Sequence, residues 1–137
     1  MAVRNKEVKN MYRLRVQTDL EAAHFLEGYK GRCANLHGHS WVVEVFVVGS
    51  DLDEVGMLVD FGYIRAELKK VVDRLDHALL NSTKEIGNPT SENLAKYIYD
   101  FMGFMVPALP SGIELEKVRI WETPRAWCEY YVEAKKV

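Results

Sequence analysis

The sequence predicts an α+β domain in which a four-stranded antiparallel sheet is covered on one face by two helices. Two segments near the start of the chain and two near its end have the alternating or β-branched pattern of strands. Between them lie two segments with apolar residues at helical spacing. The element order is therefore ββααββ, two hairpins around a helical pair, which favours helices gathered on one face of an antiparallel sheet.

The first hairpin is predicted from two extended segments. Apolar and polar side chains alternate over residues 11–19, and this strand continues with some irregularity through residues 21–25. Residues 26–36 contain two glycines and several polar residues, which indicates a loop. A second long strand follows at about residues 38–49, where aromatic and β-branched residues dominate.

The helical pair comes next. Asp60 is a suitable N-cap for the first helix. The apolar residues that follow at helical spacing are Ile64, Leu68, Val71, Val72 and Leu75. Residues 88–92 (Asn-Pro-Thr-Ser-Glu) signal a second helix start, which Thr90 or Ser91 can cap. The stripe that this second helix would bury consists of Leu94, Ala95, Ile98, Tyr99 and Met102.

The last two strands form the second hairpin. Apolar positions mark the third strand, and the break in their alternation between Leu115 and Val118 indicates a β-bulge. Residues 123–126 are typical of a hairpin connection, and residues 127–133 form the fourth strand.

Length and composition limit the function classes. The 137 residues suffice for one domain with a hydrophobic core, and no linker or repeat divides residues 1–137. A formal net charge of −2 argues against a broad basic surface for nucleic acid. The apolar runs are shorter than the roughly 18–20 residues of a membrane span. Residues 1–7 lack the apolar core of a signal peptide, and two cysteines form no disulfide framework, so we expect a cytoplasmic protein.

Three of the four histidines fall in the predicted first hairpin. His37 and His39 are two residues apart, so in an extended strand their side chains lie on one face. His24 ends the preceding strand, and antiparallel pairing would bring it near both. Three imidazoles with one open position are typical of a catalytic zinc site. We therefore predict a Zn²⁺ site formed by His24, His37 and His39, with ordinary hydrogen-bonded histidines as the alternative.

Cys33 lies four residues before His37, in the predicted loop. Its thiol could be a fourth ligand that closes the zinc site. It could also be a reactive group beside an open metal, because a nearby cation lowers the pKa of a thiol. Core packing is a third interpretation, which the loop position disfavours. The residue pattern does not separate the ligand from the catalyst.

Asp76 and His77 stand at the end of the first predicted helix. A carboxylate beside an imidazole can fix its tautomer and support proton transfer. Sequence neighbours do not face each other on a helix, so the pair can act only where the helix ends. C-terminal capping by His77 is the alternative interpretation.

Two more groups could contact a ligand. Glu122 ends an apolar strand, and its carboxylate could pair with the guanidine-like edge of a heterocycle or with Arg125. Thr90 and Ser91 could also contact a ligand, although helix capping explains them almost as well.

Six motifs between about Tyr12 and Tyr131 carry a family resemblance. They are residues 21–24 (EAAH), 33–40 (CANLHGHS), 59–61 (VDF), 74–77 (RLDH), 88–93 (NPTSEN) and 121–123 (WET). Their joint order resembles the 6-pyruvoyltetrahydropterin synthase family, and within it the carboxy-forming bacterial enzymes of the queuosine pathway. The resemblance implies the tunnelling fold (T-fold) and homo-oligomers, trimers paired into hexamers, with pterin pockets at subunit boundaries.

The resemblance also implies roles for individual residues. They are the zinc ligands His24, His37 and His39, the proton acceptor Cys33, the relay pair Asp76 and His77, the pterin anchor Glu122, which also takes part in the relay, and the pterin contacts Thr90 and Ser91. The groups that hold the triphosphate stay open, with candidates chosen by charge and loop position. These candidates are Lys30, Arg32 and Lys84.

The spacing of three residues between Cys33 and His37 resembles the carboxy-forming enzymes, because pyruvoyl-forming enzymes typically have a longer spacer. The implied reaction converts 7,8-dihydroneopterin triphosphate to 6-carboxy-5,6,7,8-tetrahydropterin, with release of acetaldehyde and triphosphate. One alternative is a 6-pyruvoyltetrahydropterin synthase, which eliminates triphosphate without cleaving the side chain. The other is a noncatalytic domain with a structural His3Cys zinc.

Overall fold

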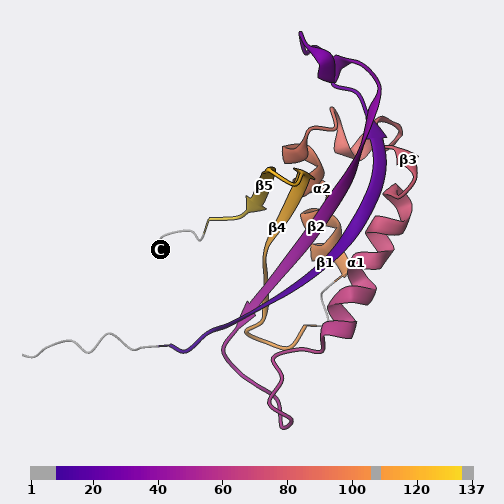
Figure 1. Cartoon of the computed structure of the whole chain (residues 1–137). Coiled ribbons are helices and arrows are strands. Elements are labelled where there is room, and N and C mark those ends of the chain that lie inside the picture. The colour runs from indigo at the N-terminus through magenta and orange to yellow at the C-terminus, as the bar shows by residue number, and fades with distance from the viewer. Residues whose placement is uncertain (1–8, 106–108, 134–137) are drawn as a thin grey trace, which may run out of the picture.

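The structure, a computed structural model, describes residues 9–105 and 109–133, so the expectation about residues 1–7 lies outside it. The main elements are β1 (Tyr12–His24), β2 (His37–Gly49), α1 (Phe61–Leu75), β3 (Ala78–Leu79), α2 (Ser91–Met105), β4 (Glu114–Thr123) and β5 (Ala126–Tyr131), as Figure 1 shows. Short 3-10 turns lie in the connections: η1 (Arg32–Ala34), η2 (Leu80–Ser82) and η3 (Lys84–Ile86).

One sheet with the strand order β3-β1-β2-β4-β5 forms one layer, and both helices cover the same face of it (Figure 1). The predicted α+β class is confirmed. The predicted count of four antiparallel strands is wrong by one, because β3 pairs in parallel with β1 at Ala22 and Ala23. A strand of two residues is too short to show an alternating pattern, so periodicity could not reveal it.

The two predicted hairpins are both present. β1 and β2 pair without interruption from Tyr12 opposite Gly49 to His24 opposite His37. In the ladder between β2 and β4, the register shifts next to Phe46, and Glu116 is the extra residue of β4. This shift confirms the bulge predicted between Leu115 and Val118.

Helix α1 begins and ends where the sequence indicates. Asp60 is its N-cap, and the Oδ1 atom accepts a hydrogen bond of 2.7 Å from the backbone N–H of Gly62. The helix ends at Leu75, and His77 just beyond it has a φ of 57°, which is uncommon for a residue other than glycine. Within the described residues, no helix is long and apolar enough to cross a membrane.

The hydrophobic core fills the space between the sheet and the helices. The strands contribute Val16, Leu20, Ala22, Trp41, Val43, Val45, Val47, Val118 and Ile120. The helices contribute Ile64, Leu68, Val71, Val72, Leu75, Leu94, Ala95, Ile98 and Met102. Because side chains alternate along a strand, His24 and His39 lie on this same covered face, at the end of the sheet where β1 leads into β2.

Candidate active site

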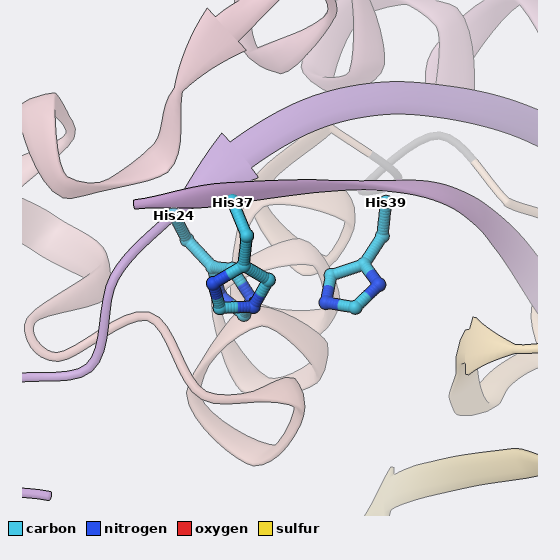
Figure 2. A group of neighbouring side chains, drawn as sticks. All are labelled: His24, His37 and His39. Carbon is cyan, nitrogen blue, oxygen red and sulfur yellow. The ribbon is translucent and has the colours of Figure 1, made fainter. Parts of the chain in front are cut away.

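Three histidines converge where β1 ends and β2 begins. His24 stands directly opposite His37 in the ladder, and His39 follows two residues later on the same face (Figure 2). One ring nitrogen from each of the three side chains lies within 4.8 Å of the others. The closest pair is Nε2 of His24 and Nε2 of His37, at 3.0 Å. The strand register therefore produces the cluster directly from the spacing of the residues.

Main-chain carbonyl groups orient two of these rings. Nδ1 of His24 lies 2.7 Å from the carbonyl oxygen of Pro89, and Nδ1 of His37 lies 2.6 Å from that of Asn35. A carbonyl oxygen only accepts, so each Nδ1 carries the proton. In a neutral ring the Nε2 atom then presents its lone pair to the centre of the cluster. This arrangement is typical of metal-binding histidines, whose second nitrogen is fixed by an outer hydrogen bond.

His39 completes the cluster, and its side chain is 21% exposed whereas that of His24 is fully buried. The Nε2 atom of His39 is buried without a hydrogen-bond partner among the described residues. Burial lowers the pKa of His39, the carboxylate of Glu122 opposes this to a lesser degree, and His24 and His37 lower it further. The neutral imidazole, which is the form that binds a metal ion, is therefore favoured.

Trp41 forms an apolar wall beside the histidines. The centroid of its ring lies 4.9 Å from that of His24 and 5.0 Å from that of His39, both edge to face. Its Nε1–H donates to the carbonyl oxygen of Ala22 at 3.2 Å, which fixes the indole. An apolar wall limits the access of water and strengthens electrostatic interactions at the site.

The cluster fits a metal ion. Four-coordinate zinc with nitrogen ligands at about 2.0–2.1 Å would hold two of those nitrogens roughly 3.3 Å apart. The separation of 3.0 Å between His24 and His37 is close to that value. Without a cation or a proton between them, two lone pairs facing at this distance would repel each other. Imidazole donors suit zinc, copper, iron and nickel.

Glu122 joins the histidines from β4. Its Oε1 atom lies 3.6 Å from Nε2 of His24 and 3.5 Å from Nε2 of His39. The pairing of β2 with β4 causes this, since Val42 stands opposite Trp121 and the next side chain points to the helix-covered face. The carboxylate is therefore within reach of a ligand held at the cluster. The sequence alone did not indicate that it would lie beside the histidines.

Cys33 is half-buried in η1, on the segment that connects the two histidine-bearing strands. Its carbonyl oxygen accepts a hydrogen bond of 2.8 Å from the N–H of Leu26. Among the described residues, the group that could hold a metal consists of the three histidines and does not include this thiol. The nearby Lys30 and Arg32 are exposed, as is Lys84 in η3.

Asp76 and His77 form a hydrogen-bonded pair where α1 ends. The Oδ2 atom of Asp76 lies 2.8 Å from Nδ1 of His77, whose side chain is 78% exposed. The backbone of Glu21 holds the pair against β1, because its N–H donates to Asp76 and its carbonyl oxygen accepts from the N–H of His77. The N–H of Glu21 and then the His77 ring lower the pKa of Asp76. Hydrogen bonds and ion pairs among the described residues do not connect this pair to the histidine cluster.

Thr90 is the residue that caps α2. Its Oγ1 atom accepts a hydrogen bond of 3.1 Å from the backbone N–H of Asn93, the third residue of the helix. Ser91 is the first helical residue, and no such bond to its hydroxyl is found among the described residues. The predicted cap therefore falls on Thr90. Pro89, which orients His24, directly precedes it.

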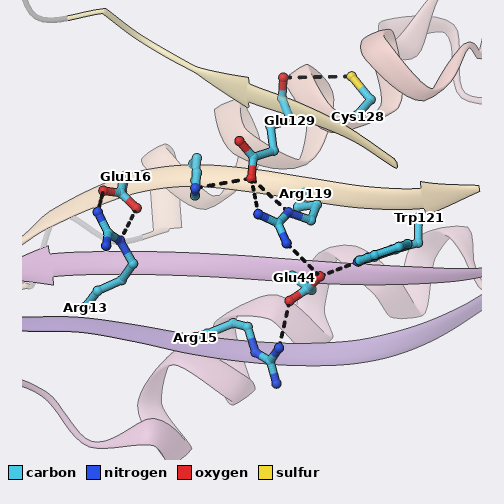
Figure 3. Close-up of polar contacts among 9 residues, drawn as sticks. Arg13, Arg15, Glu44, Glu116, Arg119, Trp121, Cys128 and Glu129 are labelled. Carbon is cyan, nitrogen blue, oxygen red and sulfur yellow. Dashed lines mark hydrogen bonds and ion pairs between the residues drawn. The ribbon is translucent and has the colours of Figure 1, made fainter. Parts of the chain in front are cut away.

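A buried carboxylate on the opposite face of the sheet was not singled out by sequence reasoning. Glu44 of β2 accepts a short hydrogen bond from the indole of Trp121 and lies 3.1 Å from Arg15 and 3.9 Å from Arg119 (Figure 3). A glutamate inside an apolar strand is the signal for it, since carboxylates are rarely buried unless paired. These contacts hold Trp121 of β4 against β2 and so help to place Glu122, the next residue of β4.

Comparisons with known proteins agree with this geometry. The family described as 6-pyruvoyl tetrahydropterin synthase matches residues 13–133. The 6-carboxy-5,6,7,8-tetrahydropterin synthase of Haemophilus influenzae is 29% identical, over 88% of this chain and 99% of that protein. The enzyme of the same name from Bacillus subtilis is 32% identical, over 87% of this chain and 84% of that protein. The structure of Caenorhabditis elegans 6-pyruvoyl tetrahydropterin synthase superposes with a TM-score of 0.77 at 29% identity, covering 90% of this chain and 97% of that one.

Proposed function

The chain belongs to the 6-pyruvoyl tetrahydropterin synthase family, and we propose that it is a zinc-dependent 6-carboxy-5,6,7,8-tetrahydropterin synthase. Its fold is that of the family, as the sequence predicts. The proposed reaction converts 7,8-dihydroneopterin triphosphate to 6-carboxy-5,6,7,8-tetrahydropterin, with release of acetaldehyde and triphosphate. It would take place in the cytoplasm and serve queuosine biosynthesis.

One observation carries the proposal most directly, the convergence of three imidazoles on a common centre. His24, His37 and His39 would hold Zn²⁺ and leave a coordination position for the side chain of the substrate. When bound, zinc supplies Lewis-acid stabilisation of negative charge on the substrate oxygens. The fixed Nδ1–H groups of His24 and His37 support this role, because they leave Nε2 available to a metal.

Proton transfer is assigned to Cys33 and His77. The Cys33 thiolate would accept a proton from the carbon-bound hydrogen of the substrate side chain. Asp76 would keep Nδ1 of His77 protonated, so that Nε2 of His77 exchanges protons at a second position. The lowered pKa of Asp76 supports this, because the carboxylate stays ionised at neutral pH.

Glu122, Thr90 and Ser91 are assigned to pterin binding. The amino-pyrimidine edge of a pterin presents two parallel N–H donors, and a carboxylate can accept both, as it does from the two N–H groups of a guanidinium. The position of Glu122 beside the histidines supports this role, since a pterin bound there would have its side chain near the metal. Thr90 and Ser91 begin the helix that follows Pro89 and would line the same pocket.

The proposal includes homo-oligomers, trimers or hexamers, with sites at subunit boundaries. Two features support it. Among the described residues, the outer edge of β1 is paired only at Ala22 and Ala23, and β5 forms the opposite edge of the sheet. Unpaired strand edges are natural sites for pairing with another chain. No hydrogen bond or ion pair among the described residues joins the Asp76–His77 pair to the histidine cluster, which also agrees with a site completed by a second subunit.

A second candidate is formation of the 6-pyruvoyl product, since the Caenorhabditis elegans protein of that name is as similar as the Haemophilus one. Incubation of the zinc-loaded protein with 7,8-dihydroneopterin triphosphate, followed by mass analysis, separates the two. We expect a 6-carboxy product and one acetaldehyde per turnover. Triphosphate release without acetaldehyde would indicate the pyruvoyl reaction. No consumption of substrate would contradict both and favour a noncatalytic domain.

A further inference from the structure

We infer that Asn81 and Asn88 act together as positioning residues for the segment that carries Cys33. This segment, residues 25–36, leaves β1 directly after His24 and returns to β2 at His37. It contains one short turn of 3-10 helix and no strand. Something other than a sheet must therefore fix its course.

Each asparagine makes a two-point contact with the backbone of one residue in the segment. Asn81 accepts from the N–H of Phe25 at 3.0 Å and donates to its carbonyl oxygen at 2.9 Å. Asn88 accepts from the N–H of Glu27 at 3.0 Å and donates to its carbonyl oxygen at 3.1 Å. Residues 25 and 27 are two apart, as are the residues of a strand that pair with one neighbour. The two side-chain amides thus take the place of a missing strand.

The contact reaches Cys33 through the residue between these two. In an extended segment, alternate N–H groups point to opposite sides. The N–H of Leu26 accordingly points away from the asparagines and donates to the carbonyl oxygen of Cys33 at 2.8 Å. The asparagines hold one side of the segment, and the backbone of Cys33 is bonded to its other side. The position of the thiol therefore depends on both amides.

The asparagines are themselves firmly placed. Leu80, next to Asn81, is completely buried, and Pro89, next to Asn88, is buried as well. The carbonyl oxygen of Asn88 also accepts from the N–H of Thr90 and from the side chain of Asn93. These two asparagines, the Asn81–Asn88 clamp, therefore join the connection between β1 and β2 to the core and to the start of α2.

Both contacts require an amide. Each side chain accepts through one atom and donates through the other, and only Asn or Gln does this with a planar group. Aspartate has the same shape but would bring a second acceptor against the carbonyl oxygen of Phe25 or Glu27. The substitutions Asn81→Asp and Asn88→Asp should therefore release the segment with almost no change in volume. Asn10→Asp, at an exposed site, is the matched control for the added charge.

Hydrogen exchange measured by mass spectrometry tests the clamp. In Asn81→Asp and in Asn88→Asp, we expect the amides of residues 25–36 to exchange about tenfold faster, the effect of losing roughly one or two hydrogen bonds. Strands β1 and β4 should exchange as they do in the unaltered protein and in Asn10→Asp. Unchanged exchange in residues 25–36, or an equal increase throughout the sheet, would overturn the inference. If the aspartate variants do not fold, Asn81→Ala and Asn88→Ala take their place, and failure of these too would assign the asparagines to global stability instead.

The consequence for Cys33 is measured separately. The rate at which iodoacetamide alkylates Cys33 should change by at least about threefold in the aspartate variants. The rate at Cys128, which serves as an internal control, should stay constant. The step to catalysis rests on the proposed function: kcat should fall about tenfold while zinc content and KM stay nearly constant. Equal alkylation of Cys33 in all variants would overturn the positioning role. If the unaltered protein has no pterin activity, the proposed function fails, whereas exchange and alkylation still decide the clamp.

Discussion

Nε2 of His24 and Nε2 of His37 face each other at 3.0 Å, although the Nδ1 atom of each ring is already engaged by a main-chain carbonyl group. The two strands that carry these rings are paired over their whole length, so the backbone positions of His24 and His37 are fixed opposite each other. The chain thus holds two electron pairs toward one point. A bound cation is the simplest way to stabilise such an arrangement.

Replacing His37 by alanine should therefore abolish metal binding, because two imidazoles remain and the closest pair is lost. Metal content after purification, measured by inductively coupled plasma mass spectrometry, should fall from about one zinc per chain to near zero. His77→Ala is the matched control, since His77 is the fourth histidine and lies outside the cluster. Full metal content in His37→Ala would contradict the assigned ligands.

Cys33→Ala should keep its zinc and lose turnover by about two orders of magnitude, the usual scale for a proton-transfer group. We expect zinc to be retained because the group that could hold a metal ion consists of the three histidines and does not include this thiol. Cys128→Ala should keep both zinc and turnover. X-ray absorption of the resting protein should show no zinc–sulfur distance of about 2.3 Å. Such a distance, or loss of metal in Cys33→Ala, would support a structural His3Cys site instead.

Glu122→Ala should weaken pterin binding by roughly tenfold to a hundredfold, the range expected for charged hydrogen bonds. Isothermal titration with a pterin that cannot react measures this directly. The metal should remain, because Glu122 lies beside the histidines without replacing any of them. Glu114→Ala, at the other end of the same strand, is the control. Equal pterin affinity in the two variants would remove Glu122 from the binding site.

Thr90→Ala and Ser91→Ala separate capping from ligand binding. Thr90 accepts from the N–H of Asn93, so its removal should lower the free energy of unfolding by about 1 kcal/mol, whereas Ser91→Ala should change it by a few tenths. Urea unfolding of the protein without ligand gives both values. A larger loss of stability in Ser91→Ala than in Thr90→Ala would show that the cap is wrongly assigned.

The parts of this molecule that sequence predicts best are those set by local periodicity. The spacing of His37 and His39 predicts their common face, and antiparallel pairing predicts the approach of His24. β3 was missed because two residues cannot show a period. Its pairing arises only because the chain after α1 returns past Ala22, which is a tertiary event.

Local sequence patterns also do not predict contacts between distant segments, because these contacts form only when the chain folds. Glu122 lies beside the histidines because β4 pairs with β2 in one particular register, which alternation alone does not specify. In the sequence, Asn88 belongs to a predicted helix start. In the structure, its side-chain amide pairs with the backbone of Glu27, 61 residues earlier. Polar side chains that bond to distant backbone carry no periodic signature. Their roles emerge only once the fold brings the segments together.

Stability should depend on pH through Asp76 in a defined direction. Its pKa is lowered in the folded protein, first by the N–H of Glu21, so the ionised carboxylate favours the folded state. This contribution is present above the unfolded pKa of about 3.9 and is lost as the pH falls through the lower folded value. Comparing His77→Ala with the double variant His77→Ala/Asp76→Asn removes the imidazole from the measurement. The difference in their free energies of unfolding should be constant from about pH 5 to pH 7 and shrink below about pH 4. A difference that grows as the medium becomes more acidic would show that the carboxylate is not held by the backbone of β1.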